Sequence, residues 1–198
     1  MNAKDEKKER SHGKILDSAG RLLRERGISG ASVADVMKGA GLTVGGFYAH
    51  FETRDQLVDD VLRRASAGLR GRLFDRLDEK APSDRAEVVL KRYLSSAHRD
   101  DVENGCPLPA VVGEVGTTAS GHGKVVAAQI DEMASELAQH LPASQGAGSR
   151  RHLALGLVAL IYGGLSLSRA LRGTELSDEV LKACRALGRF ATRNNSTA

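Results

Sequence analysis

The sequence contains few residues of the kinds that mark all-β, disulfide-stabilised or metal-binding proteins. Aromatic residues make up 4% of the 198 positions, Trp is absent, and there are only four Pro. The abundance of Ala, Leu, Val, Arg and Glu favours helix over sheet at most positions. The two cysteines, Cys106 and Cys184, are too few for the disulfide framework of a secreted domain and have no zinc-binding spacing. We therefore expect an all-α protein with reduced thiols, no metal and no cofactor.

The sequence also lacks a long hydrophobic run and an apolar leader. Its longest apolar stretch, residues 153–167, contains three glycines and lies between Arg151 and Arg169. That stretch is shorter than the roughly 20 residues that span a bilayer. The first twelve residues, MNAKDEKKERSH, are charged and contain no hydrophobic core of a signal peptide. We expect a cytoplasmic protein with no membrane partner.

The first quarter of the chain has the spacing of a helix-turn-helix. Apolar residues at helical intervals predict an amphipathic helix over 13–27 and a short second helix that follows Ser32 and ends at Gly39 or Gly41. A third helix is expected over residues 43–51, with Thr43 as its N-cap. Two short helices joined by a tight glycine-containing turn, behind a longer helix, are typical of this motif.

The third segment, LTVGGFYAHF, combines two glycines with the densest aromatic cluster of the chain. Glycines at the start of a recognition helix allow its backbone to approach the major groove closely. Phe47 and Phe51, four residues apart on one face, are the expected core anchors. Tyr48 and His50 lie off that face, where they can reach phosphate oxygens. The alternative is a helical hairpin with an aromatic plug, in which the glycines serve helix packing.

Residues 15–62, from ILDSAGRLLRERG through AGLTVGGFYAHF to TRDQLVDDVL, resemble the N-terminal DNA-binding domain of TetR-family repressors in order and without gaps. The resemblance implies that Tyr48 and His50 contact the DNA backbone, as in the family's YxHF signature. It also implies that Arg54 acts as a phosphate clamp at the start of the fourth helix. Lys38 is a further candidate phosphate contact, although a solvated lysine is an equal alternative.

The sequence departs from this family at two positions of the reading helix. Val44 stands where many members have Lys or another polar residue, and Gly46 stands where Thr, Ser or Ala is common. Fewer side chains can therefore hydrogen-bond to base edges, although Val44 can still touch a thymine methyl. The candidate DNA-binding set is Lys38, Thr43, Val44, Gly45, Gly46, Tyr48, His50 and Arg54.

Helical spacing continues through the rest of the chain. Helices are expected over 53–77, 82–100, 124–141, 150–173 and 176–193, with an irregular segment over 101–123 and a flexible loop at 143–149. The helix over 150–173 is apolar nearly all round and must be covered on every side. Gly156, Gly163 and Gly164 would admit another helix, so residues 150–193 are expected to form a homodimer interface. The alternative is the central core helix of a monomer.

The sequence identifies the effector of such a regulator only weakly. Phe74, Tyr93 and Tyr162 are candidate walls of a small-molecule pocket, and ordinary core packing is the alternative for each. Cys106, in ENGCPLP, is expected near the start of a short helix, where backbone dipoles favour the thiolate. A redox- or electrophile-responsive regulator that uses Cys106 is therefore the alternative function.

These observations combine into one expectation. The chain is an all-α homodimeric repressor with a helix-turn-helix domain at 10–56 and a bundle for effector binding and dimerisation at 57–198. Its expected partners are double-stranded DNA with a palindromic operator and an unidentified small molecule. The sequence contains no clustered nucleophile, HExxH motif or phosphate-cradling loop, so we do not expect an enzyme. A helix-turn-helix used only for protein contacts is the remaining alternative.

Overall fold

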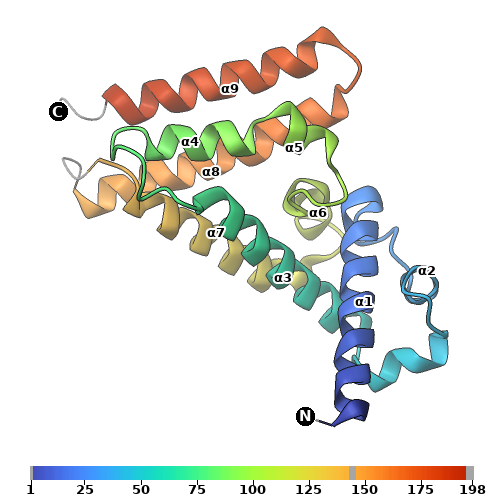
Figure 1. The fold of residues 1–198 in the computed structure, drawn as a ribbon. Helices are drawn as coiled ribbons and strands as arrows, with labels where there is room; N and C mark the ends of the chain where they lie inside the picture. The colour runs from blue at the N-terminus through green and yellow to red at the C-terminus, as the bar shows by residue number, and fades with distance from the viewer. Residues whose placement is uncertain (1, 143–145, 195–198) are drawn as a thin grey trace. The chain divides into compact units, whose positions relative to one another are not determined.

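The computed structural model describes residues 2–142 and 146–194, and every regular element within these ranges is a helix. This confirms the all-α prediction. The α-helices in chain order are α1 (Ala3–Arg26), α2 (Val33–Gly39), α3 (Arg54–Phe74), α4 (Arg85–Tyr93), α5 (Ser96–Asp100), α6 (Leu108–Val115), α7 (Gly123–Gln139), α8 (Ala147–Ala170) and α9 (Glu175–Asn194) (Figure 1). Two 3₁₀ helices, η1 (Val44–Ala49) and η2 (Ser120–His122), complete the set.

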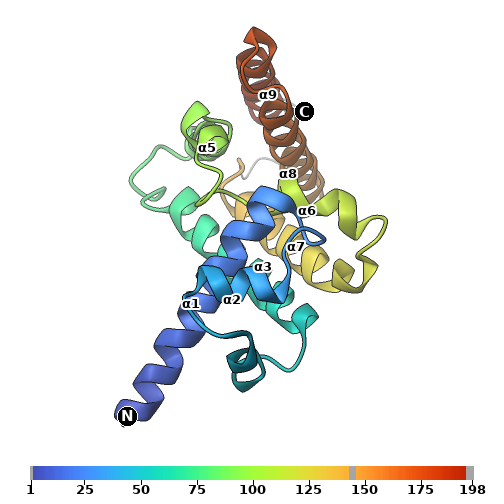
Figure 2. The ribbon, with the colours of Figure 1, turned by 90° about the vertical axis from the view of Figure 1, so that its right-hand side faces the viewer.

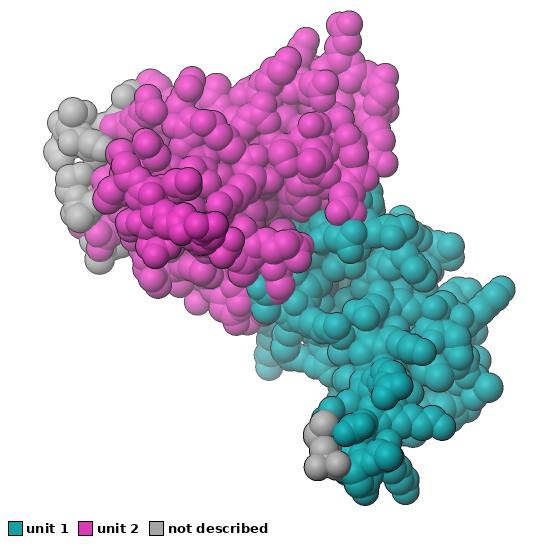
Figure 3. Space-filling view, in the orientation of Figure 1, with its two compact units in different colours: residues 1–67, 102–126 teal, residues 68–101, 127–198 magenta. Residues whose placement is uncertain are grey.

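The chain divides into two compact units (Figure 3). Unit 1 contains residues 1–67 and 102–126, and unit 2 contains residues 68–101 and 127–198. Unit 1 therefore combines the predicted DNA-binding segment with a segment from the middle of the chain. Helices α3 and α7 each have residues in both units. The functional boundary at residue 56 stays a prediction.

Helix α1 is longer at its N-terminus than the apolar spacing predicts. It begins at Ala3 rather than near residue 13, because the Asn2 side chain accepts hydrogen bonds from the backbone N–H groups of Lys4 and Asp5. The carboxylates of Asp5 and Glu6 lie in the first turn, where they stabilise the helix by interacting with the positive end of its dipole. Local capping therefore starts a helix where hydrophobic periodicity is absent.

The core of unit 1 forms where α1 packs against α2 and α6. Figure 2 shows α2 lying across α1. Ile15 and Leu23 of α1 and Met37 of α2 are fully buried. Burial of each such side chain stabilises the folded state by about 1.5–3 kcal/mol relative to leaving that side chain exposed. This core fixes the position of the segment that follows α2.

Unit 2 is built around the antiparallel pair α8 and α9, with α4 packed against both (Figure 1). The fully buried side chains at these contacts include Leu90 and Tyr93 of α4 and Ile161 and Leu165 of α8. Gly164 lies on the inner face, where an added Cβ would be 2.7 Å from Cys184 Sγ of α9. The expected close helix approach at Gly164 is therefore made within the chain.

Helix α8 has a buried face and an exposed face. Its segment Gly148–Ala170 is long and apolar enough to cross a membrane by length and composition. Its buried face packs against α9, α4 and α5, as in the core helix of a helical bundle. Gly156, Gly163 and Leu167 lie on the exposed face. Intrachain packing thus covers one side of the helix and leaves the other side uncovered.

Three predicted segments end or break differently. The helix expected over 82–100 divides into α4 and α5, because Leu94 leaves the helical conformation and the Ser95 hydroxyl caps α5 through the His98 N–H. Helix α3 ends at Phe74, shortly before Arg76 with φ 52°. Residues 143–145 of the predicted loop lie outside the described residues, and α8 already begins at Ala147.

Candidate nucleic-acid interface

The turn between α2 and η1 is closed by backbone hydrogen bonds. The Ser32 hydroxyl accepts from the Asp35 N–H and caps α2, as the sequence predicts. At the other end of α2, the Leu42 N–H donates to Met37 O at 2.9 Å, and Gly41 has φ +70°. This left-handed conformation favours glycine. The backbone conformation between α2 and η1 is therefore tightly restricted.

The reading segment is a 3₁₀ helix rather than the expected α-helix. Thr43 occupies the N-cap position but its side chain makes no capping hydrogen bond, so the predicted cap is wrong in this respect. Gly45 and Gly46 have low helix propensity, which removes the intrinsic support for a regular α-helix here. Six residues, Val44–Ala49, form the segment.

Phe47 and Phe51 anchor η1 to the core, as predicted. Each side chain is 1% exposed, and their ring centroids lie 5.7 Å apart. The His12 ring of α1 stacks on Phe51 with centroids 4.6 Å apart. These contacts hold one side of the reading segment against unit 1 and leave the other side exposed to solvent.

The exposed side presents backbone and the side chains of Val44 and Tyr48. The Tyr48 side chain is 75% exposed and that of Val44 is 51% exposed. A Cβ added at Gly45 would meet nothing within 4 Å, and one at Gly46 would meet only Met37 Cε at 3.7 Å and Thr43 Oγ1 at 3.9 Å. The surface is therefore open enough for a DNA backbone or groove edge to approach the main chain closely.

His50 is half-buried at the C-terminal end of η1. Burial, followed by the charges of His12 and Lys8, lowers the pKa of His50. Its Nδ1 is buried and makes no hydrogen bond within the described residues. At neutral pH the ring is therefore uncharged, and it can act as a single N–H donor to a phosphate oxygen.

Arg54 is the first residue of α3, and its side chain contacts the turn between α1 and α2. Its Nε donates to Ala31 O at 3.1 Å, and its Nη2 donates to Ile28 O. The guanidinium thus satisfies two carbonyls of the α1–α2 turn, and its role as a phosphate clamp stays a prediction. Lys38 is exposed near the end of α2. These placements put the predicted DNA-binding residues on α2, η1 and the start of α3.

A carboxylate from the middle of the chain supports the same turn. Glu114 of α6 accepts hydrogen bonds from the Ile28 N–H at 2.7 Å and from the Ser29 N–H at 2.8 Å. The Ser29 hydroxyl donates to the same carboxylate. Sequence reasoning missed Glu114, because no local pattern links it to partners 85 and 86 residues away.

A second polar link in unit 1 was also missed. The His122 ring is buried, and its Nδ1 lies 2.8 Å from Asp59 Oδ1 of α3. Asp55 Oδ1 lies 3.7 Å from Nε2 of the same ring. No group of His, Cys, Asp or Glu with the arrangement of a metal site occurs in the described part of the chain.

The four candidate effector-pocket residues do not form one cluster. Tyr93 and Tyr162 lie together in unit 2, with ring centroids 5.5 Å apart, and Tyr93 is fully buried. Phe74 stacks instead on His140 at 5.4 Å. Cys106 belongs to unit 1, precedes the Pro107 N-cap of α6 and is 1% exposed. Its burial offers no surface for an oxidant or electrophile, so the structure does not favour the redox alternative.

Residues 15–61 match the model of bacterial regulatory proteins of the tetR family. The N-terminal domain of this chain belongs to the TetR family. The match covers the C-terminal half of α1, all of α2 and η1, and the start of α3.

Curated relatives of this chain carry repressor names. It is 38% identical over 88 residues to the HTH-type transcriptional repressor KstR2 of Rhodococcus jostii, covering 42% of this chain and 43% of the relative. It is 34% identical over 79 residues to KstR2 of Mycobacterium tuberculosis H37Rv, covering 39% and 40%. The aligned part thus spans about two fifths of the length of these relatives.

Solved structures extend the fold likeness over nearly the whole chain. A regulator from Streptomyces coelicolor superposes with a TM-score of 0.78 at 20% identity, covering 94% of this chain and 90% of its own. A regulator from Chloroflexus aurantiacus gives 0.76 at 24% identity, covering 93% and 95%. At this identity the likeness shows the fold: an N-terminal helix-turn-helix followed by a helical C-terminal domain.

Proposed function

We propose that this chain is a DNA-binding transcriptional repressor that binds a palindromic operator as a homodimer and releases it when a small molecule binds. The observation that carries the proposal is the reading segment. Phe47 and Phe51 fix η1 to the core, while Val44, Gly45 and Tyr48 remain exposed beside it. The tetR-family match over residues 15–61 and the repressor names of the curated relatives support the same function.

The charge distribution favours a dimeric reader over a strongly charged monomer. The net charge is only +4, and Asp35 and Glu52 are exposed near the reading segment. The attraction of one helix-turn-helix to DNA phosphates is therefore modest. Two helix-turn-helix motifs related by a two-fold axis would supply the additional DNA affinity. Such a dimer reads half-sites about one DNA turn, roughly 34 Å, apart.

The exposed faces of α8 and α9 are the surfaces that we assign to dimerisation. On α9, the exposed large side chains are Leu176 at 51%, Leu187 at 57% and Phe190 at 63%. On α8, Leu167 is 57% exposed, on the same face as Gly156 and Gly163. Small residues allow a partner helix to approach, and the apolar residues are then removed from water. Two copies of this pair would form a four-helix interface.

The Tyr93 and Tyr162 pair is the part of unit 2 that we assign to the effector pocket. Tyr93 also contacts the His98 ring edge-to-face, with centroids 4.7 Å apart. An aromatic cluster of this kind would favour a ligand with an apolar or aromatic body. The ligand would favour one conformation of the dimer, and its effect on DNA affinity would equal its preference for that conformation.

Selection of bound sequences from random duplex DNA tests the proposal directly. We expect an enriched inverted repeat, bound with an affinity that falls as salt rises because phosphate contacts release counterions. Tyr48→Ala should weaken binding to the selected duplex about tenfold or more without unfolding the protein, since a phosphate contact through a polar side chain is lost. Lys124→Gln, which removes an exposed charge at the start of α7, is the matched control.

Two outcomes would contradict the proposal. No enrichment, with weak and steeply salt-dependent binding, would mean that the helix-turn-helix serves non-specific or protein contacts. Equal DNA affinity of the Tyr48→Ala and wild-type proteins would remove the reading segment from the interface.

A further inference from the structure

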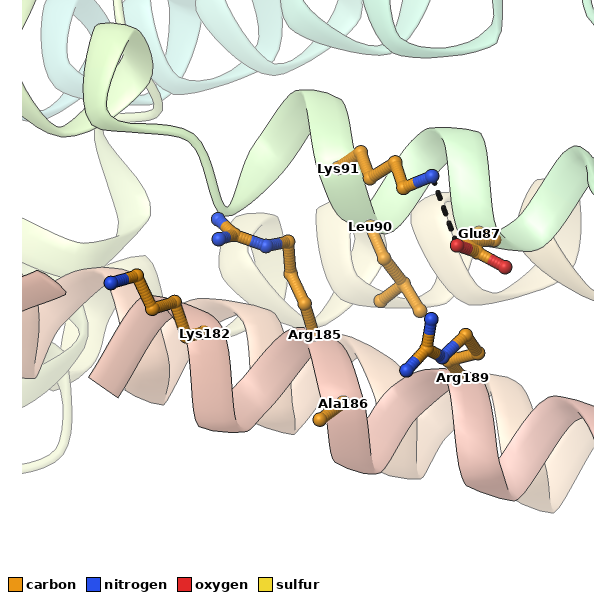
Figure 4. Close-up of a pocket in the computed structure, with 7 residues that line it drawn as sticks. All are labelled: Glu87, Leu90, Lys91, Lys182, Arg185, Ala186 and Arg189. Carbon is orange, nitrogen blue, oxygen red and sulfur yellow. Dashed lines mark ion pairs between the residues drawn. The ribbon is translucent and has the colours of Figure 1, made fainter. Parts of the chain in front are cut away.

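A pocket of about 230 Å³ lies between α4 and α9 in unit 2 and is lined mainly by cationic side chains. Four of its seven lining residues are basic and one is acidic; the set is Glu87, Leu90, Lys91, Lys182, Arg185, Ala186 and Arg189. Figure 4 shows Leu90 reaching from α4 towards α9, between Arg185 and Arg189. The floor of the pocket is thus apolar and its rim is positively charged.

Packing of the two helices brings these charges together. Gly188 lies on the face of α9 that meets α4, where an added Cβ would be 2.6 Å from Leu90 Cδ1. The absent side chain lets the helices approach closely at this point. Arg185 is half-buried and donates through Nη1 to the carbonyl oxygen of Leu94, the C-cap of α4. One wall of the pocket is therefore held in place before any ligand binds.

The single carboxylate of the pocket is already neutralised. Glu87 Oε1 lies 3.0 Å from Lys91 Nζ, and Glu87 Oε2 lies 3.2 Å from Arg193 Nη2. The hydrogen bond from Lys91 is the largest cause of the lowered pKa of Glu87. Both oxygens are therefore paired with Lys91 and Arg193, and the charge of Arg189 also acts on this carboxylate. One carboxylate is thus shared among several cations.

Three further cations of the pocket lie on one face of α9. Lys182, Arg185 and Arg189 are spaced three and four residues apart, which places them side by side on the helix. The side chains of Lys182 and Arg189 make no hydrogen bond or ion pair within the described residues. Like charges at this spacing destabilise a helix, so a bound anion would offset a cost that the free protein bears.

We propose that this α4–α9 pocket binds a small polyanion with two adjacent anionic groups, of the diphosphate class. Arg185 and Arg189 supply planar donor forks that match phosphoryl oxygens, and Lys182 supplies a point charge. Leu90 and Ala186 can contact a short apolar substituent next to those groups. The lining of the pocket does not include Tyr93, Tyr162 or the exposed apolar residues of α9, so it is an additional ligand site on the chain.

Calorimetric titration of the full-length protein with inorganic pyrophosphate, at constant ionic strength, tests this site. We expect saturable binding of one pyrophosphate per chain and weaker binding of orthophosphate. Lys182→Gln/Arg189→Gln should weaken pyrophosphate binding at least tenfold, because two charge-assisted contacts are removed. Lys80→Gln/Lys124→Gln removes the same charge from exposed lysines that do not line the pocket, and it should change the affinity less than about twofold.

The melting temperature without ligand provides a second readout. Lys182→Gln/Arg189→Gln should melt no lower than wild type, because relief of like-charge repulsion accompanies the substitution. Arg189→Lys keeps the charge but loses the planar fork, so it should bind pyrophosphate with intermediate affinity.

The inference is overturned by absent or non-saturable pyrophosphate binding, by equal losses in the pocket and control variants, or by equal affinities for orthophosphate and pyrophosphate. Loss of duplex DNA binding in the pocket variant, without pyrophosphate binding by wild type, would instead assign these cations to nucleic acid. The titration contains no DNA, so its outcome is independent of the repressor proposal.

Discussion

The Glu114 carboxylate accepts a hydrogen bond from the backbone N–H of Ser29 at 2.8 Å. It also accepts from the Ile28 N–H, so one side chain of α6 satisfies two donors of the turn that connects α1 to α2. This turn positions the helix-turn-helix. The reading segment therefore depends on a residue outside the 15–61 family match.

Glu114→Gln should lower the free energy of unfolding by about 1–3 kcal/mol, since the neutral amide is a weaker acceptor and its NH₂ group faces backbone donors. Urea denaturation of the variant against wild type measures this loss. Glu179→Gln, at an exposed position of α9, is the matched control and should leave stability unchanged. Burial opposes ionisation of Glu114, but hydrogen bonds from Ser29 and Ile28 and the nearby Arg54 lower its pKa. Its contribution should therefore be present above about pH 4.5 and lost as the pH falls further.

Gly27→Ala should destabilise unit 1 by more than an ordinary surface substitution. Gly27 has φ 72° and ψ −173°, a region that essentially only glycine occupies, and the strain costs about 1–3 kcal/mol. An added Cβ would also overlap Glu114 Oε1 and displace its carboxylate. Gly71→Ala, at an open position of α3, should raise stability by up to about 1 kcal/mol. Thermal melts that move the same way for both variants would contradict this assignment.

Phe47→Ala should lower the free energy of unfolding by about 3–5 kcal/mol, because it removes a fully buried aromatic ring and leaves a cavity. The companion substitution Tyr48→Ala removes a side chain that is 75% exposed and should leave the melting temperature nearly unchanged. Chemical denaturation of the two variants distinguishes a residue that stabilises the fold from one that lies on the proposed DNA-binding surface. Equal melting temperatures of wild type and Phe47→Ala would show that Phe47 is not an anchor.

Leu187→Glu/Phe190→Glu should convert the proposed dimer to monomers, because burying two carboxylates in an apolar interface is strongly unfavourable. Sedimentation velocity at micromolar protein concentration measures the change. Val112→Glu places a charge on an exposed apolar residue of α6 and should leave the dimer intact. A wild-type protein that sediments as a monomer would favour the alternative in which α8 is a core helix alone.

Acidification between pH 6.5 and about 4 should destabilise the protein through His98. Burial lowers the pKa of His98 from 6.5 to about 4, although its hydrogen bond with the Tyr93 carbonyl partly opposes the shift. In this range the unfolded chain binds a proton and the folded chain does not, so stability falls as the pH falls. The loss attributable to His98 amounts to about 3 kcal/mol at most. Unfolding free energies of His98→Gln should depend less on pH across this window, and an unchanged slope would contradict the assignment.

Local spacing in the sequence was sufficient to predict most of the helices and the anchors of the reading segment. Phe47 and Phe51 could be assigned because residues four apart on a helix share a face, and Ser32 because capping involves only its own helix. The early start of α1 was missed because Asn2 acts through a cap rather than through apolar periodicity. The break at Leu94 was missed because the flanking apolar pattern continues through it.

Long-range contacts account for what the sequence did not reveal. Glu114 and His122 both act on partners more than sixty residues away in the chain, and no local pattern specifies such pairs. The grouping of α6 with α1 likewise depends on tertiary packing. The α4–α9 pocket was missed for the same reason. The basic face of α9 forms part of a pocket only because α4 packs against α9 at Gly188 and places Leu90 there.

The open space at Gly45 and Gly46 has a consequence for how this protein could acquire a new target sequence. A Cβ added at Gly45 would meet no atom within 4 Å, and one added at Gly46 would make only ordinary van der Waals contacts with Met37 and Thr43. Substitution of glycine in a helical segment also favours the folded state by up to about 1 kcal/mol. Changes of recognition usually cost a protein stability. Here a single substitution could add a base contact and strengthen the reading segment at once, so the two glycines make this surface unusually free to evolve.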